Sequence, residues 1–214
     1  EAETPGASAG IGMHFFAGAV LLLFGPIQLI SQVRAKAPAV HRWIGRVYAL
    51  AAFLAGVGGL TFIAIKGTVG GMPMTVGFAM YGGLMVIAAV QTVRHAMARN
   101  IDIHRAWAVR LFALAIGSWL YRMAYGFWFL FAGETGHTDE FSGWFDYVMD
   151  FAFFIPPLIV AEMFIRARRG QATTAGRVAT TTALAGGAAF IALATFFFTL
   201  YGWGPAIAMR FGSA

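Results

Sequence analysis

Six long apolar runs constrain this chain more than any other feature of its sequence. They span residues 12–33, 46–65, 73–96, 108–131, 145–165 and 179–203. A helix needs roughly 20 apolar residues to cross a hydrocarbon core of about 30 Å. Barrel strands would alternate apolar and polar residues, whereas these runs are apolar on every face. The sequence therefore predicts an all-α, polytopic membrane bundle of about six transmembrane helices.

The composition excludes several kinds of chemistry. Apolar residues make up 59% of the 214 residues, charged residues make up 11%, and the mean hydropathy is +0.72. The absence of cysteine excludes disulfides, thiolate metal sites and thiol catalysis, and leaves histidine as the strong soft-metal ligand. The sequence has no phosphate-binding glycine motif, Ser-His-Asp arrangement or zinc-protease signature. It therefore leaves open whether the protein is an enzyme.

The basic residues predict how the chain is oriented. They follow the first, third and fifth runs and are Arg34, Lys36, Arg42, Arg46, Arg94, Arg99, Arg105, Arg110, Arg166, Arg168, Arg169 and Arg177. The positive-inside rule places these connections in the cytoplasm and both termini in the periplasm of a bacterial inner (cytoplasmic) membrane. Because orientation accounts for the net charge of +6, we expect the lipid bilayer, and not nucleic acid, as the partner.

These patterns also predict how the chain is divided. We expect a polar periplasmic N-terminus over residues 1–11, a duplicated four-helix core over 12–132, a periplasmic loop over 133–144 and two additional transmembrane helices over 145–214. Pro156 and Pro157 should bend the fifth helix.

The core is predicted to be duplicated because a His-Arg-Trp-Arg phrase occurs twice. At a shift of 63 residues, or of 64 after the inserted Ala106, the matched pairs include Gln28 and Gln91, His41 and His104, Trp43 and Trp107, Arg46 and Arg110, and Tyr48 and Phe112. Because the shift covers an even number of crossings, helices 1 and 2 should form a parallel internal repeat with helices 3 and 4. A pseudo-two-fold axis along the membrane normal would then bring the two histidines to one cytoplasmic-side space.

Three segments carry a resemblance to a known family: "GMHFFAGAVLLLFGPIQ", "HRWIGRVY" and "HRAWAVRLFALAIGSWLYR". Over roughly residues 12–130 they resemble an uncharacterised bacterial family of predicted membrane proteins of unknown function. The resemblance implies an architecture and no particular activity. More loosely, the topology and histidine placement are similar to the four-helix di-haem cytochrome b families, which pass electrons across membranes. That second comparison is an analogy of architecture.

The cytoplasmic side holds the first candidate site. Its predicted cofactor-binding residues are His41, His104, Gln28, Gln91, Arg46 and Arg110. In one interpretation, His41 and His104 ligate the iron of a b-type haem, and the arginines bind its propionates. In the other, the histidines cap helices and bind lipid phosphate at the headgroup boundary. We expect Glu162 to pair with Arg46 or Arg110, and His95 to lie on a solvated basic helix end.

The second candidate site depends on Arg122, about 21 Å beyond the cytoplasmic entry of the fourth helix at about 1.5 Å per residue. A charge at that depth needs a partner, and the nearest candidates are Asp146 and Asp150. The predicted outer polar cluster consists of His14, Arg122, Tyr125, Asp146 and Asp150. It forms either an outward-facing ligand or quinone pocket, in which His14 exchanges a proton, or an Arg-Asp pair that locks helix 5 against helix 4. We expect His137 to be solvated.

Two main functions follow from these sites. The first is a haem b electron-transfer or accessory redox protein, with a quinone or a larger membrane complex as its partner. The second is a non-redox protein that binds lipid headgroups or serves as an accessory subunit of such a complex. A small-solute transporter is a third hypothesis. An absorption spectrum separates the first from the others.

Overall fold

The computed structural model describes residues 5–212, and the regular structure in that range is entirely helical. The helices are α1 Pro5–Leu29, α2 Ser31–Lys36, α3 Pro38–Lys66, α4 Gly71–Met97, α5 Ile101–Ala132, α6 Trp144–Ala152, α7 Ile155–Arg168, α8 Thr174–Phe198, the π-helix η1 Thr199–Trp203 and α9 Gly204–Phe211. The predicted all-α fold is confirmed. Glu1 and Glu3 of the predicted polar N-terminus lie outside the described residues, and α1 begins at Pro5, earlier than the predicted residue 12.

Five helical segments are long and apolar enough to cross a membrane: Pro5–Leu29, Pro38–Lys66, Gly71–Met97, Trp144–Arg168 and Thr174–Phe211. They correspond to five of the six predicted crossings. The sixth, α5, is the longest helix in the described range at 32 residues. It is less hydropathic because it carries Arg122 together with several tyrosines and tryptophans.

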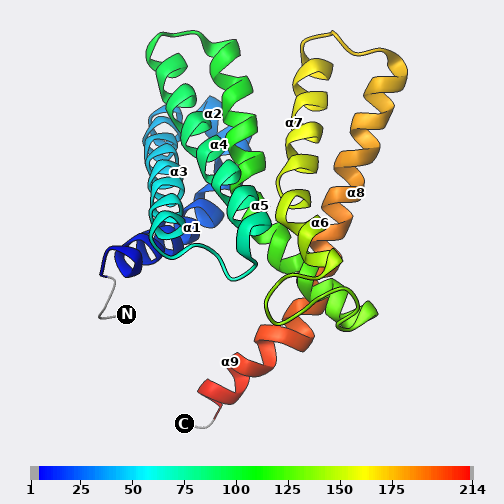
Figure 1. The fold of residues 1–214 in the computed structure, drawn as a ribbon. Coiled ribbons are helices and arrows are strands. Elements are labelled where there is room, and N and C mark those ends of the chain that lie inside the picture. The colour runs from blue at the N-terminus through cyan, green and yellow to red at the C-terminus, as the bar shows by residue number, and fades with distance from the viewer. Residues whose placement is uncertain (1–4, 213–214) are drawn as a thin grey trace.

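The helices pack in chain order around α5. Helix α1 packs against α3, α3 against α4 and α4 against α5, while α7 and α8 contact the other side of α5 (Figure 1). The buried core between these helices is built from small and aromatic side chains, including Ala52, Ala88, Tyr81 and Phe154. Since protein covers much of α5, it needs less apolar surface than its neighbours.

The fifth predicted helix is interrupted in place of being bent. Helix α6 ends at Ala152, and α7 begins at Ile155 with Pro156 and Pro157 in its first turn. Proline has no backbone N–H to donate to the preceding turn, and it fits the start of a helix. The Phe154 N–H bonds to the Phe151 carbonyl at 3.3 Å, which closes the turn between the two helices.

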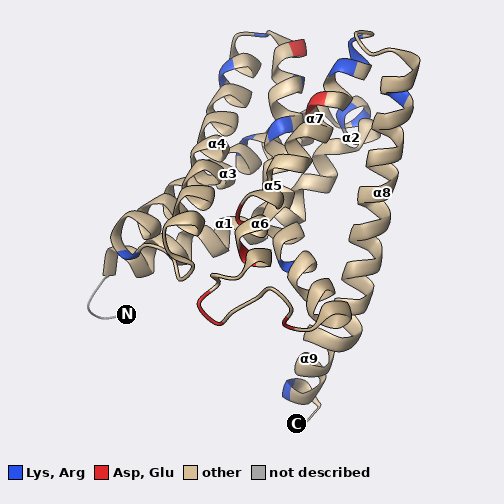
Figure 2. Ribbon diagram, turned by 45° about the vertical axis from the view of Figure 1, so that its right-hand side comes forward, with Lys and Arg blue, Asp and Glu red and all other residues tan. Residues whose placement is uncertain are grey.

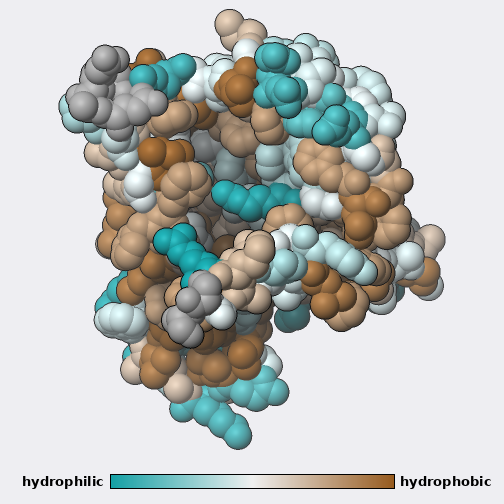
Figure 3. All heavy atoms as spheres, turned by 90° about the horizontal axis from the view of Figure 1, so that it is seen from below, coloured by the Kyte–Doolittle hydropathy of each residue, from teal (hydrophilic) through white to brown (hydrophobic). Residues whose placement is uncertain are grey.

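The two ends of the bundle differ in charge. Most lysines and arginines gather at the end formed by α2 and by the α4–α5 and α7–α8 connections (Figure 2). The start of α1, the 133–143 loop and α9 lie at the opposite end. Seen from that end, the surface is hollowed, and hydrophilic side chains border the hollow (Figure 3). The three basic connections therefore share one end, as the sequence predicts.

Candidate functional site

The histidines of the repeated phrase lie in the first turns of α3 and α5. Pro38 starts α3 three residues before His41, and Ile101 starts α5 three residues before His104. Both histidine side chains are half-buried. The two histidines therefore occupy matching positions at the starts of α3 and α5.

Hydrogen bonds orient these two residues. His104 Nδ1 lies 2.9 Å from the Thr92 carbonyl oxygen. Because a carbonyl only accepts, His104 carries a proton on Nδ1 and donates it to Thr92. The Gln28 amide donates to the backbone carbonyl of His41 at 3.3 Å. The Nδ1 atom of His41 itself is buried and has no hydrogen-bond partner within residues 5–212.

Other polar atoms nearby also lack partners. Gln91 Oε1, His95 Nδ1 and the Tyr48 hydroxyl are buried without a hydrogen bond to any described residue. His95 is half-buried in the last turn of α4, so the predicted basic helix end is confirmed and its ring is only partly solvated. Buried polar groups are nearly always bonded to protein or ordered water. We call His41, Tyr48, Gln91, His95 and His104 the imidazole site. Its unbonded polar atoms are available to hydrogen-bond or ligate a bound group.

The two arginines of the repeat differ in their surroundings. Arg110 donates to Glu162 through both Nε and Nη2, the latter at 3.0 Å from Oε2, and lies 4.8 Å from the centre of the Trp107 ring. This confirms one of the two partners predicted for Glu162. Arg46 is exposed. Because Arg110 is paired with Glu162, Arg46 is the arginine of the repeat that is more available to bind an anionic ligand.

At the opposite end, Asp146 is the centre of a hydrogen-bonded cluster. Its carboxylate is 0% exposed. Oδ1 accepts from the Tyr125 hydroxyl at 2.7 Å and from His137 Nδ1 at 2.7 Å. Oδ2 accepts from the backbone N–H groups of Thr138 at 3.2 Å and Gly143 at 2.9 Å. Four donors satisfy an ionised carboxylate, which accepts and never donates.

Asp150 lies one helical turn further along and has the opposite environment. It is also 0% exposed, yet neither carboxyl oxygen has a partner among the described residues. Its backbone oxygen faces Gly77 of α4, where an added Cβ would lie only 2.4 Å away. This close approach of α4 and α6 removes Asp150 from water. We call Tyr121, Tyr125, His137, Asp146 and Asp150 the carboxylate cluster.

Two members of the predicted outer cluster lie elsewhere. The Arg122 side chain is exposed and donates to the Ser118 carbonyl of its own helix at 3.1 Å. Within the described range it forms no ion pair with Asp146 or Asp150, so the predicted Arg-Asp pair is wrong. His14 bonds through Nδ1 to the Ala55 carbonyl at 2.9 Å, between α1 and α3.

His137 is a site residue that the sequence analysis missed. Its side chain is only 12% exposed and bonds to Asp146. The prediction that it is solvated is therefore wrong. The loop is tied to α5 by the Trp128 indole, which donates to the Thr135 carbonyl at 2.7 Å. Asp146 was the sequence signal for this cluster. An acidic residue at the third position of a helix typically accepts from the N–H of the capping residue, which predicts that Asp146 binds the loop before α6.

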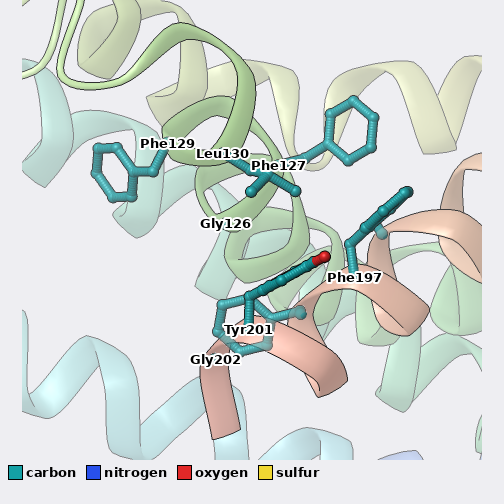
Figure 4. A pocket seen from close by; sticks show the side chains of 9 residues that line it. Gly126, Phe127, Phe129, Leu130, Phe197, Tyr201 and Gly202 are labelled. Carbon is teal, nitrogen blue, oxygen red and sulfur yellow. The ribbon is translucent and has the colours of Figure 1, made fainter.

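A third feature is an apolar pocket of about 250 Å³ between the end of α5 and the α8–η1 junction. Phe127, Phe129, Phe197 and Tyr201 are among the residues that line it (Figure 4). No histidine or acidic side chain belongs to its lining. This pocket suits an apolar chain and offers nothing to a metal ion.

The fold defines an all-helical membrane protein with several apolar crossings and two buried polar sites near opposite ends. Residues 11–165 match the family described as Predicted membrane protein (DUF2306). The chain belongs to this family, whose function is unknown, and the resemblance found in the sequence is confirmed. No curated protein and no solved structure matches the chain.

Proposed function

We propose that this membrane protein binds a b-type haem between His41 and His104 and acts as an electron-transfer or accessory redox protein. The observation that supports the proposal is the state of the two imidazoles. His104 donates its Nδ1 proton to the Thr92 carbonyl, and His41 Nδ1 is buried without a partner in the described chain. Metal-ligating histidines almost always donate their other ring N–H in this manner, and neutral imidazoles are common axial ligands of haem.

The residues around the pair position these ligands. Thr92 fixes the tautomer of His104, and Gln28 holds the first turn of α3 through the His41 carbonyl. Arg46 is the arginine left for a haem propionate, since Glu162 engages Arg110. A bound haem supplies reversible one-electron chemistry, for which a quinone or a larger membrane complex is the proposed partner.

The proposal assumes that the two hairpins are copies of each other, and the packing around Gly25 supports this. An added Cβ there would lie 3.3 Å from Tyr48 Cε2 and 3.2 Å from Phe112 Cε2, which are matched positions in the repeat. The same two rings line a hollow of about 50 Å³. Neither histidine lines this hollow, so a haem held by His41 and His104 would lie outside it.

Absorption spectroscopy tests the proposal. The protein is purified from cells supplied with a haem precursor, and a Soret band and a pyridine haemochrome are expected. Both should be lost in His41→Ala and in His104→Ala, and kept in His14→Ala, which changes a histidine that bonds only to Ala55. A folded wild-type protein that stays colourless after haem supply would rule the proposal out.

Lipid-headgroup binding, with or without a role as an accessory subunit, is the second candidate. The exposed side chains of Arg42, Arg46 and Arg105 at the basic end favour it, because arginine suits phosphate. Native mass spectrometry of gently extracted protein should then show a retained anionic lipid that is lost when the three arginines become glutamine. A lone, lipid-free wild-type monomer would count against this candidate.

We also propose that the basic end faces the cytoplasm of a bacterial inner membrane, with both termini in the periplasm. The gathering of the basic connections at one end supports this orientation. An alkaline phosphatase fusion at the C-terminus should be active, and one in the 98–100 connection should be inactive. The reverse pattern would overturn the orientation.

A further inference from the structure

The carboxylate cluster has one fully satisfied member and one fully unsatisfied member. Asp146 accepts four hydrogen bonds, from Tyr125, His137, Thr138 and Gly143. Asp150 accepts none from the described residues. The two carboxyl groups lie one turn apart and are both buried. Only Asp146 has hydrogen-bond donors that stabilise a negative charge.

An ionised Asp150 would have no compensation. The cations that the described residues offer near it are the Arg122 guanidinium, which is exposed and bonded to Ser118, and the His137 ring, which bonds to Asp146. The Asp146 carboxylate, one turn away in α6, carries a like charge. Burying an unpaired charge costs far more than burying a neutral polar group.

The elements packed around Asp150 contribute hydroxyl groups and aromatic rings. Helix α4 brings Gly77 and Tyr81, and the Tyr81 hydroxyl donates to the Leu114 carbonyl. Helix α5 brings Tyr121, whose ring packs against Phe153 of the turn after α6. No basic side chain of the described residues bonds to Asp150.

A chain of hydroxyl groups leads from Tyr121 to the 133–143 loop. The Tyr121 hydroxyl donates to the Tyr125 hydroxyl at 3.4 Å, and Tyr125 donates to Asp146 at 2.7 Å. His137 bonds to the same carboxyl oxygen at 2.7 Å and belongs to the 133–143 loop. Chains of acidic, histidine and hydroxyl groups inside membrane proteins are typical of proton pathways.

We propose that Asp150 is a proton-binding site within the bundle, and that it exchanges its proton with the 133–143 loop through Tyr121, Tyr125 and Asp146. Neither Asp150 oxygen bonds to Tyr121 in the structure, so the Asp150 side chain must first turn toward that hydroxyl. As Asp150 then releases its proton to the Tyr121 oxygen, Tyr121 passes its own proton to Tyr125. Tyr125 in turn passes its proton to Asp146 Oδ1. The number of protons is conserved, and each hydroxyl is restored when the chain runs in reverse.

The site is independent of the haem proposal, because it shares no residue with the imidazole site. It also differs from a sodium site, since a bound sodium ion would leave Asp150 ionised. The protonated and ionised forms of a carboxyl group absorb at different infrared frequencies. The two occupants can therefore be told apart without any assay of activity.

Infrared spectroscopy of the purified full-length protein at neutral pH tests the proposal. The wild type should show a band from a protonated carboxyl group, and Asp150→Asn should lose it. The matched control, Asp139→Asn, changes an exposed aspartate of the loop and should keep the band. If Asp150→Asn does not fold, Asp150→Glu retains a carboxyl group and should shift the band. A wild type without the band, or a band unchanged in both Asp150 variants, would overturn the proposal.

Hydrogen–deuterium exchange of the same band tests the route. Transfer of the wild type into heavy water should shift the band as the carboxyl proton is replaced. Tyr121→Phe removes one hydroxyl from the chain and should slow the shift. Tyr201→Phe, the same change at an exposed tyrosine of η1, should not. Equal exchange rates in the three proteins would exclude the hydroxyl chain as the route.

Discussion

Replacing Asp146 with alanine removes the acceptor of four hydrogen bonds, from Tyr125, His137, Thr138 and Gly143. A hydrogen bond to a charged group contributes about 1.5–3 kcal/mol, and a buried donor left unsatisfied costs about 1–3 kcal/mol. Water can reach the loop donors once the carboxylate is gone, whereas the Tyr125 hydroxyl stays buried. We therefore expect Asp146→Ala to lower the free energy of unfolding by about 4 kcal/mol, roughly half of it from Tyr125.

The free energy of unfolding is measured by titrating the micelle-bound protein with SDS and following the circular dichroism. Asp146→Asn retains one acceptor oxygen and should lose about half as much as the alanine variant. The control Asp139→Ala changes an exposed loop residue and should stay within about 0.5 kcal/mol of the wild type. A loss below about 1 kcal/mol in Asp146→Ala would show that the four bonds do not hold the loop and α6 together.

Three further changes test the packing and the charges. Gly77→Ala should lower the free energy of unfolding by about 1–3 kcal/mol, because the added Cβ overpacks α4 against α6. Gly83→Ala in the same helix, with nothing within 4 Å of the added Cβ, should not destabilise the protein. Equal unfolding free energies for the two variants would contradict the close approach. Glu162→Gln should cost about 1 kcal/mol or less because the ion pair is partly exposed, and Arg110→Gln should add little to it in the double variant; full additivity would contradict the pairing. Arg122→Leu should leave the free energy of unfolding unreduced, and a large loss would mean that Arg122 has a buried partner after all.

The helices were predictable because crossing a membrane requires long apolar segments. The length requirement predicts where the chain crosses the membrane. It does not predict short helices that do not cross it. Helix α2 has only six residues and gives no periodic signal. The interruption between α6 and α7 was anticipated only as a bend at Pro156 and Pro157, because the loss of two backbone donors does not by itself decide between a bent helix and a broken one.

The sequence predicts how deep in the membrane a residue lies. It does not predict which side of its helix the side chain occupies in the bundle. Arg122 lies at the depth of the carboxylate cluster. Successive helical residues, however, point about 100° apart, while residues four apart share a face. Tyr121 and Tyr125 therefore share one face of α5, from which Tyr125 reaches Asp146 of α6, whereas the Arg122 side chain is exposed. Which face of α5 meets α6 is a tertiary fact that the sequence alone does not contain.

The number of bonds that each buried polar group makes separates structural residues from candidate functional ones better than depth or charge does. Asp146 has its four acceptor positions filled by the chain itself, so its substitution should act through the fold as well as on the proposed proton route. His41 Nδ1 and the Asp150 carboxyl oxygens are buried without partners among the described residues, so the fold does not depend on hydrogen bonds from these atoms. His41→Ala and Asp150→Asn should therefore remove what these residues bind while the protein stays folded, whereas loss of function at Asp146 should accompany unfolding.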